Sequence, residues 1–196
     1  MVKSLPMRIC KLGEEVLRTK CEEVKPEEIN DEMRALFNEM FETMISANGC
    51  GLAAPQIGIS KRFFVIIADD DVRRVFINPV ITKTSSELSD YEEGCLSLPG
   101  FSESIRRPAK VSISALNEFG KRFVIEDAEG LLGRCIQHEN DHLDGILYID
   151  RGDESVKNEI IEKFKKKAER AAEKAAAKAR KQASIAAKIA AKQNKK

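Results

Sequence analysis

The last 40 residues of the chain, 157–196, are too poor in large apolar side chains to form a hydrophobic core. After Phe164 the large aliphatic residues are Ile185 and Ile189, and the rest is mostly Ala, Lys, Glu and Arg, which favour an α-helix. A packed core needs more buried apolar surface than this stretch can supply. We therefore predict one globular domain over residues 1–152 and a helical tail over residues 153–196.

The tail and the body carry opposite net charges. Residues 157–196 hold 14 Lys and Arg against 4 Glu, a net charge of +10, whereas the other 156 residues hold 19 basic and 28 acidic side chains, a net charge of −9. Three interpretations remain open: a solvated helix, a helix that binds a phosphate-rich surface, and a helix that docks on the acidic body. The absence of Trp disfavours the aromatic platforms that stack single-stranded nucleic acid.

Periodic patterns in the body indicate an α+β fold. Residues 30–49 begin at Asn30 or Asp31 as a helix cap, end near Gly49, and carry an apolar helical stripe of Met33, Leu36, Phe37, Met40, Phe41 and Met44. Residues 62–68, 72–82, 110–117 and 121–128 are typical of strands, and residues 117–120 of a hairpin turn. Residues 129–144 return to a helical pattern. Because no strand–helix–strand unit repeats, we expect the strands to be antiparallel.

Both histidines of the chain lie in the segment QHENDH at residues 137–142. On a helix, His138 and His142 lie one turn apart on one face, where two imidazoles can bind one divalent ion. Glu139 flanks that site and can take a proton from a water that the ion has acidified. The pattern predicts a metal hydrolase in which antiparallel strands pack around this helix, with an N-terminal helix and a long basic C-terminal helix.

The third metal ligand decides the class of hydrolase. The metzincin pattern requires a histidine at position 148, where this chain has Tyr148, although Gly145 is in register. A thermolysin-like site would use a downstream glutamate, and the candidates are Glu154, Glu159, Glu162, Glu169 and Glu173. Cys95 in the segment YEEGCLSLPG is the other candidate, since its thiolate would complete a Cys–His–His set with one open position. Residue types alone leave a glutamate and Cys95 both open.

Three segments, in this order, resemble the signature motifs of the peptide deformylase family: GCGLAAPQIG (49–58), EGCLS (93–97) and QHENDH (137–142). The segments MRICKLGEEVLR and LPGFSESIRRPAKV also resemble this family, so the similarity covers about residues 5–150, and the long Ala/Lys tail departs from it. The resemblance implies an enzyme that hydrolyses the N-formyl group of formyl-methionyl nascent peptides and releases formate.

Carried over to this sequence, the resemblance implies that Cys95, His138 and His142 bind the metal and that Glu139 is the general acid and base. Gln56 and the backbone N–H of Leu96 would donate hydrogen bonds to the formyl oxygen, as an oxyanion requires. The substrate-binding residues implied are Cys50, Gly51, Leu131 and Cys135. The spacing only permits this pocket, and Leu131 and Cys135 also fit an ordinary core.

A thiolate with two imidazoles suits zinc or ferrous iron. The resemblance favours one Fe²⁺ per chain in the cell, with Zn²⁺, Ni²⁺ or Co²⁺ replacing it in preparations, and it favours ribosome association of the tail. The scattered cysteines and the lack of an apolar run of about 18 residues predict free thiols in a cytoplasmic protein without a membrane partner. We also expect a monomer. The alternatives are an H-E-x-x-H endopeptidase and a basic-tailed ribosome- or RNA-binding protein with a structural metal.

Overall fold

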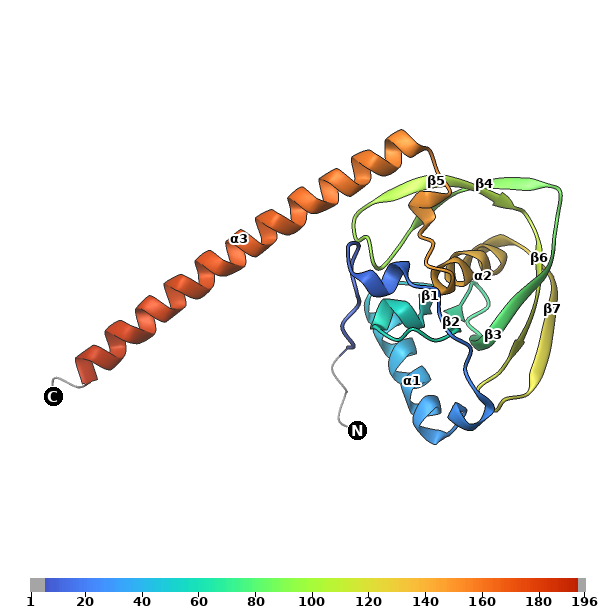
Figure 1. The fold of residues 1–196 in the computed structure, drawn as a ribbon, viewed down its shortest axis with the longest axis horizontal. Helices are drawn as coiled ribbons and strands as arrows, with labels where there is room; N and C mark the ends of the chain where they lie inside the picture. Colours follow the sequence, from blue (N-terminus) through green and yellow to red (C-terminus); the bar gives the residue numbers. More distant parts are fainter. Residues whose placement is uncertain (1–5, 194–196) are drawn as a thin grey trace. The chain divides into compact units, whose positions relative to one another are not determined.

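The computed structural model describes the backbone of residues 6–193 and the side chains of residues 6–182. The chain divides into two compact units, Met1–Glu154 and Ser155–Lys196. The helices and strands are α1 (Asp31–Ser46), β1 (Gly51–Ala53), β2 (Phe63–Ile67), β3 (Arg73–Thr84), β4 (Leu88–Gly94), β5 (Ser102–Pro108), β6 (Val111–Leu116), β7 (Arg122–Ala128), α2 (Gly130–Leu143) and α3 (Glu154–Gln193) (Figure 1). Short 3₁₀ turns are η1 (Glu15–Arg18), η2 (Pro26–Glu28), η3 (Ala54–Ile57) and η4 (Tyr148–Asp150).

The strands of the first unit form two antiparallel sheets. A five-stranded sheet has the order β1-β2-β3-β6-β7, with Phe64 of β2 opposite Phe76 of β3, and β4 pairs with β5 in a separate two-stranded sheet. The predicted mixture of helices and antiparallel strands is confirmed, with β2, β3, β6 and β7 near the predicted positions. Strands β1, β4 and β5 were not predicted.

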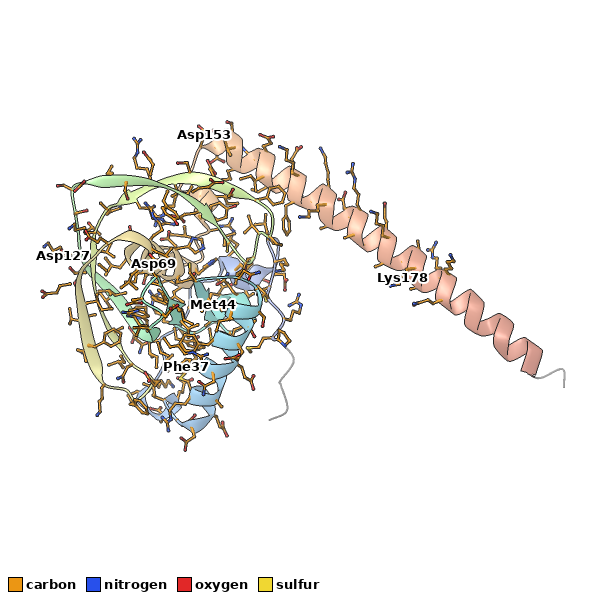
Figure 2. All side chains as sticks on the ribbon, turned by 180° about the vertical axis from the view of Figure 1, so that it is seen from behind. Phe37, Met44, Asp69, Asp127, Asp153 and Lys178 are labelled. Atoms are coloured by element: carbon orange, nitrogen blue, oxygen red, sulfur yellow. The ribbon has the colours of Figure 1, made fainter. Side chains whose placement is uncertain are left out.

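Helix α1 covers one face of the five-stranded sheet. Its predicted cap is present, since Asn30 Oδ1 accepts a hydrogen bond from Met33 N at 3.0 Å. Phe37 and Met44 lie on the face of α1 that packs against the core side chains of β2 (Figure 2). The helix ends near Gly49 as predicted, at Ser46, but Gly49 itself does not take the left-handed conformation. Asn48 takes the left-handed conformation at φ 56° instead, and the N–H of Gly49 bonds to Met44 O, which is a Schellman-type ending.

Helix α2 lies between the two sheets. On one side Ile136 and Leu143 pack into a core cluster that includes Phe64 of β2. On the other side the guanidinium of Arg134 donates to the backbone oxygens of Ser89 and Ile105, on β4 and β5. Because both sides of this helix are covered, its polar side chains are buried as well, and their hydrogen-bond partners must come from the protein.

The described part of the second unit is helix α3, from Ser155 to Gln193. Ion pairs join Glu159 to Lys163 and Glu162 to Lys166 across one turn, with the acid on the N-terminal side, the more favourable order. The predicted C-terminal helix is confirmed. Within residues 6–193, none of the helices combines the length and apolar character needed to span a membrane.

Candidate active site

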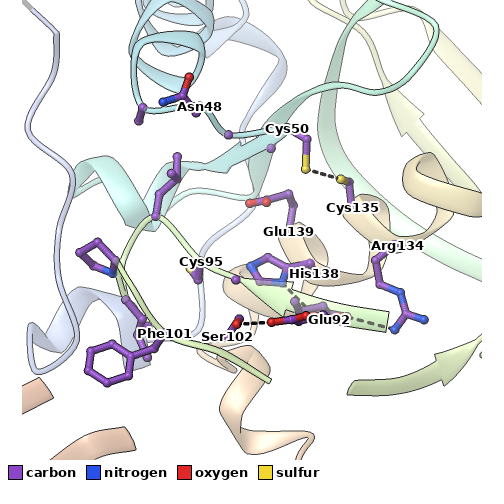
Figure 3. Close-up of a pocket in the computed structure, with 18 of the residues that line it drawn as sticks. Asn48, Cys50, Glu92, Cys95, Phe101, Ser102, Arg134, Cys135, His138 and Glu139 are labelled. Atoms are coloured by element: carbon purple, nitrogen blue, oxygen red, sulfur yellow. Dashed lines mark hydrogen bonds and ion pairs between the residues drawn. The ribbon is translucent and has the colours of Figure 1, made fainter. Parts of the chain in front are cut away.

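A pocket of about 710 Å³ opens beside α2 (Figure 3). Its walls come from the end of α1 and the start of β1, from β4 with the turn after it, and from α2. The predicted site residues that line it are Cys50, Gly51, Gln56, Cys95, Leu96, Leu131, Cys135, His138 and Glu139. The structure thus brings residues from all three sequence motifs to one cavity. His142 does not line this cavity, but it contacts Cys95, which does.

Three buried donor side chains converge at this pocket, and two of them, Cys95 and His138, line it. Cys95, His138 and His142 each offer one potential ligand atom, and these three atoms lie within 4.8 Å of one another. Cys95 Sγ is 3.3 Å from His142 Nε2. Burial raises the pKa of the Cys95 thiol, but the two imidazoles outweigh this effect and hold that pKa well below its usual value. A thiolate and two imidazoles in this arrangement can hold one divalent metal ion.

Glu139 projects into the pocket from α2, next to this cluster (Figure 3). Its Oε2 is buried and has no hydrogen-bond partner among the described residues. Burial raises the pKa of its carboxyl well above the usual value. Gly51 leaves room for the carboxylate, because a Cβ at position 51 would lie 2.3 Å from Glu139 Oε1. Glycine at this position is therefore required by close contact.

The amide of Gln56 is fixed by its own turn. Gln56 Oε1 accepts a hydrogen bond from Ala53 N at 2.8 Å, so Nε2 faces the cluster and donates to Cys95 Sγ at 3.4 Å and Ser97 Oγ at 3.3 Å. The side chain of Leu96 packs against Gly49, where a Cβ would lie 2.8 Å from Leu96 Cδ1. The pocket thus holds a buried amide donor beside the proposed ligand thiol.

A buried charge network surrounds the cluster and was not predicted. Glu93 Oε2 lies 2.9 Å from His138 Nδ1, and the Glu93 carboxylate also accepts from Arg107 Nε at 2.7 Å and Arg134 Nη1 at 3.0 Å. Arg107 continues to Asp141 Oδ2 at 2.6 Å. Burial raises the pKa of Glu93, but the hydrogen bonds from His138 and Arg107 outweigh it and bring that pKa to about 2. The acidic pair before Cys95 was visible in the sequence, but nothing there indicated which carboxylate faces inward.

Tyr148 stands where a metzincin would place its last histidine. Its ring stacks on His138 with 6.0 Å between centroids, and its hydroxyl donates to Phe101 O at 3.1 Å. Tyr148 therefore packs against His138 as a neighbouring side chain. Within the described residues, the ligand group that the geometry assembles contains none of the downstream glutamates.

Comparisons with known proteins show which family this chain belongs to. The model of the polypeptide deformylase family matches residues 6–158. The peptide deformylase of Fusobacterium nucleatum is 48% identical over 156 residues, which cover 80% of this chain and 89% of that protein. The crystal structure of a peptide deformylase from Legionella pneumophila is 38% identical, with a TM-score of 0.78, and the match covers 86% of this chain and 98% of that one.

A second solved structure, a peptide deformylase from Synechococcus elongatus in complex with actinonin, is 41% identical with a TM-score of 0.76. That match covers 83% of this chain and 88% of the other. The chain belongs to the polypeptide deformylase family, metal-dependent hydrolases that remove the N-formyl group from nascent polypeptides.

Proposed function

We propose that this deformylase holds one divalent metal ion on Cys95, His138 and His142. The observation that carries the proposal is the convergence of three buried donor atoms within 4.8 Å. The low pKa of Cys95 supports it further, because a thiol must be deprotonated to bind a metal. This donor set suits Fe²⁺ and Zn²⁺, and we propose Fe²⁺ in the cell, with Zn²⁺, Ni²⁺ or Co²⁺ in preparations. When bound, the ion supplies Lewis acidity, which acidifies a water and polarises the formyl group.

Glu139 is the general base and then the general acid. Its Oε2, which has no protein partner among the described residues, accepts the proton that the attacking water releases. The raised pKa of the buried carboxyl lets it keep this proton and then donate it to the departing amine nitrogen. Formate and a free amino terminus are the products, so the carboxylate returns to its starting state.

Gln56 and Leu96 stabilise the negative charge that develops on the formyl oxygen. Gln56 Nε2 is a neutral donor that already faces the cluster, and the N–H of Leu96 follows directly after the ligand Cys95. Donors fixed in advance beside a developing oxyanion are typically worth a hundred-fold or more in rate. Cys50, Gly51, Leu131 and Cys135 form the part of the pocket that receives the methionine side chain, since all four line it.

The experiment follows formate release from formyl-Met-Ala-Ser and metal content in matched variants. Glu139→Gln keeps the size of the side chain but cannot accept the proton, so kcat should fall by roughly 10² to 10⁴ while the metal stays bound. Cys95→Ser should lose metal and activity together, whereas Cys135→Ser, one helical turn from His138, should keep its metal. Full metal content in Cys95→Ser would contradict the ligand set, and undiminished turnover in Glu139→Gln would contradict the base. Internal peptide cleavage without formate would favour the endopeptidase alternative.

We also propose that the enzyme acts in the cytoplasm as a monomer and that α3 keeps it near emerging nascent chains. The +10 charge of residues 157–196 on a helix supports attraction to ribosomal phosphate through counterion release, which needs no sequence specificity.

A further inference from the structure

Two thiols in the pocket wall lie in direct contact. The Sγ atoms of Cys50 and Cys135 are 2.7 Å apart, although the residues are 85 positions apart in the sequence (Figure 3). Cys50 directly precedes β1 and is half-buried, whereas Cys135 lies on α2 and is buried. Both are free thiols, and both line the pocket. Neither takes part in the proton transfers or the metal binding proposed above.

This contact makes the two thiols chemically different. The hydrogen bond from Cys135 lowers the pKa of Cys50 to about 7, against the opposing effect of burial. The same contact and burial raise the pKa of Cys135. Cys50 is therefore the more acidic thiol of the pair, and it lines the pocket, where a small molecule can reach it. Cys135 is the neighbouring thiol that can react with whatever forms on Cys50. An accessible nucleophile beside a resolving thiol is the arrangement of redox-sensitive cysteine pairs.

We propose that a hydroperoxide, with hydrogen peroxide as the simplest case, oxidises Cys50, and that Cys135 then closes a disulfide across the pocket wall. In the first step the Cys50 sulfur attacks one peroxide oxygen, the O–O bond breaks, and the departing hydroxide takes a proton to become water. In the second step Cys135 loses its proton and its sulfur attacks the Cys50 sulfenic acid. The S–O bond breaks and a second water leaves. The two thiols lose two electrons, and the peroxide gains them.

The two sulfur atoms need to move only a little to form the disulfide bond. The sulfurs must approach from 2.7 Å to about 2.05 Å. The new bond would tie the residue before Gly51 to α2 one turn before Glu139, and it would change the shape of the pocket wall that the proposed function assigns to the methionine side chain. The effect on turnover rests on the proposed function, whereas the disulfide itself does not. Since small changes in a side-chain pocket alter kcat/KM by about ten-fold or more, we expect a loss of that size, mainly through KM.

The test uses the metal-loaded, fully reduced chain and one equivalent of hydrogen peroxide. We expect each chain to lose the mass of two hydrogen atoms and a proteolytic digest to contain one cross-linked pair of peptides, with Cys50 joined to Cys135. Cys10 and Cys21, which are buried elsewhere, should remain free thiols and serve as internal controls. Dithiothreitol should remove the cross-link and restore kcat/KM.

Two variants separate this pair from oxidation of the metal ligand Cys95. In Cys135→Ser, peroxide should leave a sulfenic acid on Cys50 that dimedone traps, with no cross-link. Cys21→Ser should form the cross-link as the unaltered chain does. The proposal is overturned if Cys50 stays fully alkylatable after peroxide, or if the cross-linked chain keeps its kcat/KM. A reduced enzyme that releases no formate would instead contradict the proposed function, because the cross-link is measured by mass.

Discussion

Glu93 connects the candidate metal site to the protein around it. Its carboxylate lies 2.9 Å from His138 Nδ1, and both Arg107 and Arg134 bond to it from the other side. A carboxylate on the outer nitrogen fixes the tautomer of an imidazole and directs its other nitrogen toward a metal. Glu93 is therefore a positioning residue for His138. Its negative charge also offsets the positive charge of two buried guanidinium groups, those of Arg107 and Arg134.

Glu93→Gln should weaken both metal binding and the fold. The amide cannot compensate the buried arginines, and breaking a buried ion pair costs about 3 to 5 kcal/mol of unfolding free energy. Loss of such a supporting carboxylate lowers metal affinity by about 10- to 100-fold. Metal titration and thermal unfolding measure the two effects. Glu92→Gln is the matched control, because the exposed Glu92 bonds to Ser102 Oγ and does not contact the arginines. Equal effects of the two substitutions would contradict this role.

At the scale of elements, α1 is the clearest case of a helix whose start depends on one side chain. Asn30 Oδ1 accepts from Met33 N at 3.0 Å, which satisfies a backbone donor that has no partner within the helix. Asn30→Ala should lower the unfolding free energy by about 1 kcal/mol and Tm by about 3 °C. Asn30→Asp keeps the acceptor and should restore most of the loss in thermal unfolding. A Tm unchanged in Asn30→Ala would show that the cap contributes nothing measurable.

The seven strands that the structure describes differ in how well their sequences predicted them. Strands β2, β3, β6 and β7 were predicted because apolar, β-branched residues dominate them, whereas β4 and β5 were not. In these two strands the buried positions are Glu93, Ile105 and Arg107, so two of the three inward-facing side chains are charged and no apolar alternation results. The resemblance to the peptide deformylase family implied that Cys95 joins the two histidines, whereas the residue types alone left a downstream glutamate open as well. The arginine network was not predictable, because only the folded chain reveals which charged side chains face inward.

At the scale of the whole molecule, the chain consists of two units with opposite net charge. Truncation after Glu154 removes the second unit and the +10 charge but keeps all proposed site residues. The truncated enzyme should hydrolyse formyl-Met-Ala-Ser with an unchanged kcat/KM, and it should no longer co-sediment with ribosomes at low salt. Sedimentation of the full chain should fall steeply as salt rises, because it depends on counterion release. Equal sedimentation of both forms, or sedimentation independent of salt, would leave α3 as a solvated helix or one docked on the body.

Cys95 follows β4, whereas both histidines lie on α2, so an ion bound to all three would join segments 47 positions apart. An ion that binds the folded chain alone stabilises it in proportion to the logarithm of its free concentration. The lifetime of this protein in a cell would then depend on the metal supply. A newly made chain that fails to acquire its ion would be inactive and also easier to unfold, and proteases would remove it sooner than its loaded copies.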